Sequence, residues 1–297
     1  MKALRQILSF IFTHPLTRDH KLSAVWRFLK WQWVSRTFPY PFIYPFVNDS
    51  KLIIRKGMSG ATGNLYAGLH EFEDMAFLLH LLREGDFFGD IGANIGSYTV
   101  LASAVTHART ITVEPIPSTF QSLKHNVAIN DIENLVQLRN CGVGSVNGKL
   151  SFTKNFDTIN HVVTPSMIRE YDTVEVDVTT LDQLFEGLSP ALLKIDVEGF
   201  ELEVLKGGRQ LLSGSGLKAI MIELNGLCHS FGVREEDIHG LLLSYGFSPH
   251  EYLPFERKLI SKDSFSGSGN TLYIRDKSWI EQRIEGAPKF SVLNRAI

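Results

Sequence analysis

Five polar side chains stand where predicted β-strands end, and four of them are acidic: Asp90, Glu114, Asn140, Asp196 and Glu223. Ligands of open α/β sheets bind outside the carboxyl ends of the strands, so these groups should surround a common site. Carboxylates in such a place could accept hydrogen bonds from ribose hydroxyls, take a proton from an acceptor, or bind a cation.

The first of these strand ends opens a glycine-rich turn that runs from Asp90 through Gly92 and Asn94 to Gly96. A dinucleotide fingerprint would have glycine at positions 92, 94 and 97, but this chain has Asn94 and Ser97. Asn94 would obstruct a pyrophosphate, and no Gly-Lys-Ser/Thr sequence follows to bind a triphosphate. The turn therefore fits a ligand with a nucleoside but no phosphates. Taken alone, it could also be a plain strand-to-helix connection.

The next two strand ends could complete a nucleoside site. Glu114 lies 24 residues after Asp90, where an acidic side chain can accept hydrogen bonds from both ribose hydroxyls. Asn140 and Cys141 follow the third strand and could provide partners for an adenine ring. The alternatives are a solvated strand-end carboxylate for Glu114 and a simple polar turn after the third strand.

The fourth and fifth strand ends indicate the groups that would do chemistry. Asp196 ends the central strand and is the first candidate for a general base. Glu198 and Glu223 could form a carboxylate cluster with it. Close carboxylates raise one another's pKa, which suits a base, or they bind Mg²⁺, and the sequence does not choose between these roles. Glu198 could equally fix the turn before the helix that starts at Phe200.

Histidines and cysteines give weaker signals. His229 follows the fifth strand and is a second candidate base, although a lone loop histidine is often incidental. No metal-ligand spacing is found among His70, His80, His107, His125 and His161, so we predict no zinc site. The two cysteines, Cys141 and Cys228, form neither a disulfide framework nor a metal cluster, which favours a reducing compartment.

Strands and helices alternate along the chain that carries these groups. Predicted strands cover residues 87–91, 109–114, 135–138, 191–196 and 217–224, with two late strands near 247–252 and 271–275. Predicted helices cover residues 71–84, 97–105, 117–130, 200–212 and 235–245. Residues 149–153 and 173–178 alternate with period two and are expected to form an antiparallel insertion. This order predicts an α/β fold with a mostly parallel sheet and helices on both faces.

Three segments of this chain stand out in order along it: DIGANIG (90–96), VEPIPSTFQSLKHN (113–126) and LKIDVEGFELEVLKGG (193–208). With these segments the chain resembles the FkbM-type family of S-adenosylmethionine-dependent methyltransferases, over roughly residues 65 to 225. The resemblance implies a three-layer, Rossmann-like class I methyltransferase fold with a seven-stranded sheet. This chain departs from the family pattern at Gly89, where a β-branched residue is usual, and at Phe200, where a small residue is usual.

The same resemblance implies S-adenosylmethionine as the cofactor and Asp196 at the methyl-transfer centre. It also implies a cofactor site made by Asp90, Gly92, Asn94, Gly96 and Glu114. The expected activity is O-methylation of a hydroxyl on a sugar, glycolipid or secondary metabolite. A nicotinamide-dependent oxidoreductase is a second hypothesis, which Asn94 and Ser97 disfavour. A catalytically silent cofactor-binding protein is a third.

The formal charge of −2 conceals a strong asymmetry along the chain. Residues 1–56 contain ten Lys/Arg against two acids, and the rest contains 20 basic and 30 acidic side chains. A composition of 44% hydrophobic and 21% charged residues argues against disorder and against a multi-span membrane protein. We predict a basic, aromatic N-terminal extension or cap (1–56), a methyltransferase domain (57–276) and a C-terminal tail (277–297).

The N-terminal extension poses a question of its own. Its first apolar stretch is shorter than a signal peptide's and lacks a cleavage site, so we expect a cytoplasmic protein. Residues 24–36 read as an amphipathic helix in which Trp26, Trp31 and Trp33 alternate with basic residues. This helix could rest on an anionic membrane surface, giving peripheral contact, or pack onto the sheet domain as a cap, which is the favoured interpretation. We expect the acceptor pocket to involve residues 1–70, 154–172 and 226–270, and we expect no nucleic-acid partner.

Overall fold

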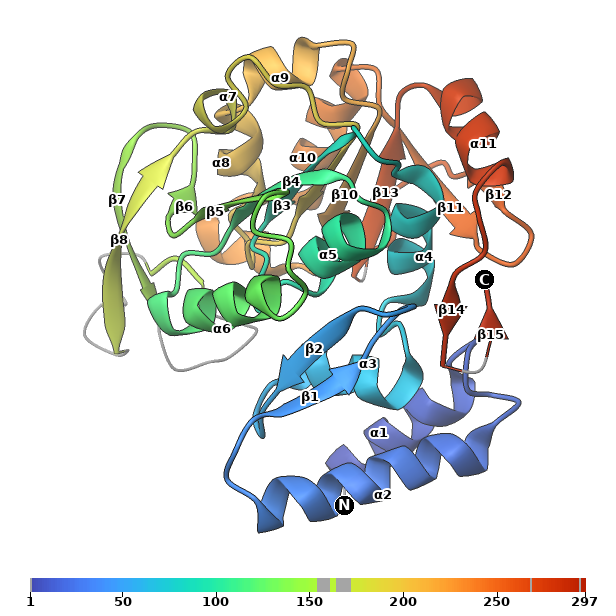
Figure 1. The fold of residues 1–297 in the computed structure, drawn as a ribbon. Coiled ribbons are helices and arrows are strands. Elements are labelled where there is room, and N and C mark those ends of the chain that lie inside the picture. Colours follow the sequence, from blue (N-terminus) through green and yellow to red (C-terminus); the bar gives the residue numbers. More distant parts are fainter. Residues whose placement is uncertain (1, 154–160, 164–171, 268, 294) are drawn as a thin grey trace.

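A computed structural model describes residues 2–153, 161–163, 172–267, 269–293 and 295–297 (Figure 1). Its centre is an eight-stranded sheet in the order β12 (Lys258–Ser261), β11 (Ser248–Leu253), β13 (Asn270–Ile274), β10 (Ala219–Glu223), β9 (Leu192–Ile195), β3 (Phe87–Ile91), β4 (Arg109–Val113) and β5 (Val136–Arg139). The strands from β10 to β5 pair in parallel, while β13, β11 and β12 join by antiparallel pairing. This confirms the mostly parallel sheet, with β12 as a strand beyond the seven expected.

Helices cover both faces of this sheet, as the alternating pattern predicted. One face packs against α4 (Phe72–Leu81), α5 (Ser97–Val100) and α11 (Lys277–Glu285). The other packs against α7 (Leu181–Leu184), α8 (Glu201–Lys206), α9 (Arg209–Ser213) and α10 (Glu235–Ser244). The strand β9 is buried along its whole length, which fits a central strand of a covered parallel sheet.

Three helix predictions differ from the structure in detail. The predicted helix 97–105 changes after α5 into a π-helical segment, Leu101–Val105. The predicted helix 200–212 is divided into α8 and α9 at Gly207 and Gly208, because glycine is a poor helix former. The helix predicted over residues 71–84 is α4, which ends earlier, at Leu81.

The insertion after β5 has the expected antiparallel pairing. The strand β7 (Gly148–Thr153) pairs with β8 (Thr173–Thr179), and β6 (Gly142–Val143) adds a third strand. Thr180 caps α7, because its side chain accepts a hydrogen bond from the Gln183 backbone N–H. Most of the segment 154–172 lies outside the described residues, so its predicted part in the acceptor pocket stays a prediction there.

The N-terminal segment is a folded layer against the Gly-rich turn. It contains α1 (Lys2–Thr13), α2 (Lys21–Thr37), the hairpin of β1 (Phe42–Pro45) and β2 (Lys51–Ile54), and α3 (Ser59–Ala67). In Figure 1 these elements lie together below the sheet. The side chain of Asn126, on α6 (Pro117–Ala128), joins the layer to the turn: its Oδ1 accepts from the Ile53 N–H, and its amide donates to the Ile95 carbonyl.

Residues 277–297, predicted as a C-terminal tail, contribute side chains to the hydrophobic core. After α11 the chain forms the hairpin β14 (Ser291–Val292) with β15 (Arg295–Ala296). The apolar side chains that enter the core from this segment are Ile280, Ile284, Phe290, Val292 and Ile297. Their alternation with charged residues is too short a pattern to distinguish a docked helix from an exposed one.

Within the described part of the chain, we find no helix with the length and apolar character that crossing a bilayer requires.

Candidate active site

A cavity of about 510 Å³ opens at the carboxyl edge of the central strands. Its wall includes α3 on one side and the insertion strand β7 on another. Many of the residues predicted from the strand ends line it: Asp90, Gly92, Asn94, Glu114, Cys141, Asp196, Glu198 and Glu223. The structure therefore brings the predicted cofactor and catalytic groups into one space.

The Gly-rich turn approaches the end of β9 very closely. A Cβ atom on Gly92 would lie 1.8 Å from the Asp196 carbonyl oxygen, and Gly92 has a φ of +81°. Asn94 also has a positive φ, of +53°, and its side-chain oxygen accepts from the Ile95 N–H at 2.8 Å. Gly96 does not line the cavity but caps α5 in a left-handed conformation. The turn thus needs glycine for close approach and for backbone conformation.

Gly92→Ala should therefore distort the site. We expect a loss of about 1–3 kcal/mol of stability, since the added methyl group meets backbone and the conformation is strained. Thermal unfolding of the variant measures this loss. Gly148→Ala is the control, because a Cβ at that position has nothing within 4 Å. Equal unfolding curves for the two variants would contradict the close approach.

Gly89, which departs from the family pattern, has a packing explanation. A Cβ there would lie 2.5 Å from Leu193 Cδ1 and 2.6 Å from Phe185 Cζ. In this chain the side chains of Leu193 and Phe185 fill the space that a β-branched residue at position 89 would take. Phe200, the other departure, lines the cavity and makes an edge contact with Phe231.

Glu114 is held by the backbone around it. Its two carboxylate oxygens accept from the N–H groups of Asn94 at 3.0 Å and Ile116 at 2.9 Å. Burial raises the pKa of Glu114 to about 7, with smaller contributions from nearby carboxylates, although the two N–H donors oppose the shift. Each oxygen keeps a lone pair for a further donor.

Of the neighbours Asn140 and Cys141, only Cys141 lines the cavity. Asn140 does not line the cavity, and its amide donates to the carbonyls of Glu114 at 2.8 Å and Pro115 at 3.0 Å. It therefore fixes the backbone that carries Glu114. Cys141 lines the cavity, and burial raises the pKa of its thiol to about 11, so it presents a neutral surface at physiological pH.

Asp90 is buried beneath the turn and has one free oxygen. Its Oδ2 accepts from the Thr99 hydroxyl at 2.6 Å, whereas Oδ1 is buried with no hydrogen-bond partner in the described structure. Burial raises the pKa of Asp90. Asp90 also lines the cavity, and a buried oxygen without a partner is a candidate acceptor for a ligand's donor group.

Lys194 is the main site residue that the sequence analysis did not single out. Its ammonium lies 2.6 Å from Asp196 Oδ2 and 4.8 Å from the centre of the Tyr98 ring. Only 4% of its side chain is exposed. Burial opposes its charge, but the carboxylates of Asp196, Glu71 and Asp90 raise its pKa above the usual value. The signal in the sequence was a lysine inside an apolar strand, two residues before Asp196 on the same face.

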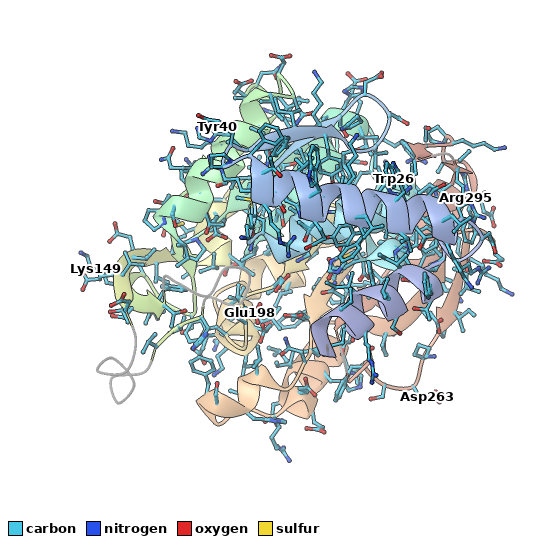
Figure 2. The ribbon with its side chains drawn as sticks, turned by 90° about the horizontal axis from the view of Figure 1, so that it is seen from below. Trp26, Tyr40, Lys149, Glu198, Asp263 and Arg295 are labelled. Carbon is cyan, nitrogen blue, oxygen red and sulfur yellow. The ribbon has the colours of Figure 1, made fainter. Side chains whose placement is uncertain are left out.

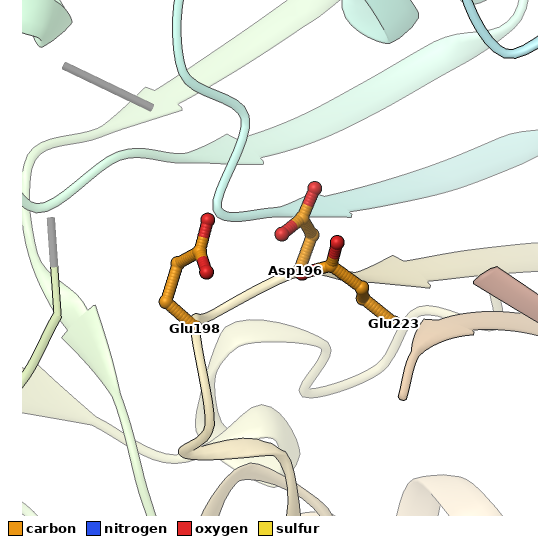
Figure 3. Close-up of side chains that lie close together, drawn as sticks. All are labelled: Asp196, Glu198 and Glu223. Carbon is orange, nitrogen blue, oxygen red and sulfur yellow. The ribbon is translucent and has the colours of Figure 1, made fainter. Parts of the chain in front are cut away.

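Three carboxylates converge in the cavity beside Lys194. One oxygen from each of Asp196, Glu198 and Glu223 lies within 4.8 Å of the others, and Figure 3 shows Asp196 between the two glutamates. Burial and the neighbouring carboxylates raise the pKa of Glu198 to about 7 and raise that of Glu223 further. The Lys194 ammonium compensates Asp196. The cluster can thus hold a proton or receive a cation.

The turn that carries Glu198 has its own support. Glu198 has a φ of +54°, and Gly199 follows at +100°. The buried carboxylate of Glu201 accepts from the Gly199 N–H at 2.9 Å, so the turn-fixing role considered for Glu198 belongs to Glu201.

His229, proposed as a second base, is exposed on the 3₁₀ helix Leu227–Phe231 and does not line the cavity. The helix turns its neighbour Cys228 inward instead. His229 is therefore not placed to take a proton from a group in the cavity.

Comparisons with known proteins agree with this arrangement. Residues 90–249, more than half of the chain, match the family model described as the methyltransferase FkbM domain. Hexuronic acid methyltransferase AglP of Haloferax volcanii is 31% identical over 174 residues, which cover 58% of this chain and 67% of that protein. Methyltransferase 1 of Beauveria bassiana is 30% identical over 162 residues, which cover 46% and 64%.

A solved structure, methyltransferase FkbM from Methylobacillus flagellatus, matches with 18% identity and a TM-score of 0.46, covering 85% of this chain and 60% of that one. This chain spans about two thirds of the length of the curated relatives it matches, 64% to 67%. From the matched domain, and from a site built at the predicted strand ends, we conclude that the chain belongs to the FkbM methyltransferase family.

Proposed function

We propose that this protein transfers a methyl group from S-adenosylmethionine to a hydroxyl oxygen of a neutral, sugar-like acceptor. The observation that carries the proposal is one cavity with a nucleoside-type carboxylate, Glu114, and a separate carboxylate cluster around Asp196. The family membership supports methyl transfer, and the name of one relative, a hexuronic acid methyltransferase, supports a sugar acceptor.

The residues of the cavity fit this cofactor. Glu114 can accept hydrogen bonds from ribose hydroxyls with its free lone pairs. The unpartnered Asp90 oxygen suits an ammonium group. Neutral Cys141 and the neighbouring turns leave room for an adenine ring. S-adenosylmethionine supplies a methyl group on a positively charged sulfur, which the surrounding carboxylates favour.

Asp196 is the proposed general base. The Lys194 ammonium holds one of its oxygens, and its side chain is 27% exposed and lines the cavity where an acceptor hydroxyl would bind. Alignment of acceptor and methyl group would contribute most of the rate, about 7–11 kcal/mol. Because Lys194 already supplies the positive charge beside Asp196, we favour this role over Mg²⁺ binding.

The acidic cluster also bears on the acceptor. Lys194 is the only Lys or Arg among the described residues that line the cavity, and it already pairs with Asp196, so a carboxylate substrate would meet the acidic cluster with no free cation. A neutral polyhydroxylated acceptor can donate hydrogen bonds to these same oxygens. The proposed acceptor is therefore a hydroxyl of a neutral sugar, free or carried by a lipid or another small molecule.

The test uses isotopically labelled S-adenosylmethionine with matched pairs of neutral saccharides and their uronic acids, with and without a chelator. We expect label in the neutral members and retained transfer after metal removal. Label only in the uronic acids would overturn the acceptor assignment, and loss of transfer restored by Mg²⁺ would overturn the metal-free base. Tight binding of S-adenosylmethionine with no labelled acceptor would favour the catalytically silent alternative. Binding of NAD instead of S-adenosylmethionine would favour the oxidoreductase.

Cofactor binding should weaken as the pH falls below about 7. Glu114, with a pKa of about 7 in the free protein, loses its charge and an acceptor site when it is protonated. Glu114→Ala should weaken binding by about 1–3 kcal/mol. Calorimetric titration with S-adenosylmethionine between about pH 5.5 and about pH 8.5 measures the pH dependence of cofactor binding. Glu114→Gln is the control, since it cannot titrate. The same pH slope in that variant would assign the effect to another group.

A further inference from the structure

The helix α2 is apolar on two opposite faces, and the described chain covers one of them. Its inner face, with Ala24, Phe28 and Trp31, packs against α3 and β2. Its outer face carries an apolar stripe with helical spacing that is 51% to 88% exposed: Leu22, Trp26, Leu29 and Trp33. Trp31 therefore packs against the layer beneath the helix, as in the cap interpretation, whereas Trp26 and Trp33 are exposed.

The stripe continues into the segment that follows the helix. Trp33 makes an edge contact with Phe38 at 6.3 Å, and Tyr40 and Ile43 are 73% and 60% exposed. In the view from below, Tyr40 lies at one end of α2 and Trp26 lies along it (Figure 2). The exposed side chains of α2 and residues 38–43 therefore form one surface, which we call the α2 face.

The segment that carries the α2 face is rich in basic residues and nearly free of acids. The helix has no Asp or Glu, and residues 1–56 contain only Asp19 and Asp49. Asp19 already pairs with Arg295 at 2.6 Å. A hollow of about 590 Å³ lies at the end of the helix, where Arg36, Arg55 and Lys56 stand beside aromatic rings. That combination suits an anionic headgroup beside an apolar chain.

We propose that the α2 face binds the surface of an anionic lipid bilayer. Tryptophan side chains favour the membrane interface, and Lys/Arg groups near it are attracted by anionic lipids. A second copy of the chain is a poorer partner, because two-fold pairing would oppose two segments with the same excess of positive charge. The acidic excess of the rest of the chain would favour an orientation with α2 toward the lipid.

Binding in this orientation brings the bilayer near the proposed active site. Beneath α2, the helix α3 contributes Gly60, Ala61 and Asn64 to the cavity wall. In Figure 2, Glu198 lies to one side of α1 and α2 and is not hidden behind them. A lipid-linked acceptor could reach such a site from the membrane surface.

The test is co-sedimentation of the full chain with vesicles of phosphatidylcholine alone or with about 30% phosphatidylglycerol. Neither methyl donor nor acceptor is present, so the outcome does not depend on the proposed activity. We expect binding to the anionic vesicles only, weakened by roughly 0.5 M NaCl. W26S/W33S and R55E/K56E should each reduce the partition coefficient about tenfold or more.

Val146→Ser is the matched control, because Val146 is 71% exposed but lies in the turn before β7, outside the α2 face. Its vesicle binding should equal that of the unchanged chain. Thermal unfolding and size-exclusion chromatography with light scattering accompany each variant. No binding by the unchanged chain, or equal binding by W26S/W33S, would overturn the proposal. If the unchanged chain is a dimer and W26S/W33S is a monomer, the α2 face binds a second copy of the chain instead.

Discussion

Asp196→Asn should reduce methyl transfer by about 10²- to 10⁴-fold while the dissociation constant for S-adenosylmethionine changes less than about threefold. Asparagine keeps the shape of the side chain and can still accept a hydrogen bond from Lys194, but it cannot take a proton from the acceptor. Single-turnover kinetics with saturating labelled cofactor measure the chemical step, and calorimetry measures cofactor binding. Full activity in this variant would remove Asp196 from the mechanism.

Glu223→Gln is the matched comparison for that experiment. Burial and the adjacent carboxylates raise the pKa of Glu223, so its side chain is neutral near pH 7, and glutamine imitates a neutral carboxyl group. We therefore expect a loss of less than about tenfold, far smaller than for Asp196→Asn. If Glu223→Gln is the more severe change, the base is Glu223 and the two roles must be exchanged.

Lys194→Met should lower the free energy of unfolding by about 3–5 kcal/mol, because it removes the cation that compensates buried carboxylates. Methionine keeps an unbranched apolar side chain, so the effect measures chiefly the lost charge. Chemical denaturation gives the change in stability. Lys218→Met is the control: it breaks the ion pair with Asp276, which is only partly buried, and should cost no more than about 1 kcal/mol.

Lys194 is a positioning residue in this scheme, and two further measurements separate that role from simple stabilisation. The double variant Lys194→Met/Asp196→Asn should recover about 1–3 kcal/mol relative to additivity, because it removes both members of the pair. In the single variant, the rate of transfer at saturating cofactor should fall while the dissociation constant for S-adenosylmethionine changes little, since Asp196 is no longer held in place. Additive stabilities and an unchanged rate of transfer would show that the contact with Asp196 is unimportant.

Much of the site could be predicted from sequence because strand ends follow local rules. Asp90, Glu114, Asp196 and Glu223 each end a short apolar run, and parallel strands must bring such ends to one edge. The antiparallel insertion was equally local, since period-two alternation in β7 and β8 directly indicates two half-exposed strands. The predictions that the structure bears out are those in which position along a strand fixes position in space.

The parts that could not be predicted depend on packing between distant segments. Lys194 is significant only because Tyr98 and Glu71, from other elements, meet it at the centre of the sheet. The cavity wall formed by Asn64 requires α3 to dock on the Gly-rich turn, which no local pattern encodes. His229 follows a strand end as the cavity-lining carboxylates do, but it lies exposed on a 3₁₀ helix, so a position after a strand end does not by itself place a side chain in the cavity.

The hairpin β14–β15 has a consequence for biosynthesis. Val292 bridges to Val47, Arg295 pairs with Asp19, and Ser291 exchanges hydrogen bonds with Asn48. On the ribosome, residues 1–70 emerge long before residues 291–297, so these contacts can form only late in translation. Until then the outer surface of the N-terminal layer lacks its last partner. We therefore expect the protein to depend on chaperones while it is being synthesised, before residues 291–297 can make these contacts. Refolding of the complete chain should depend on chaperones less.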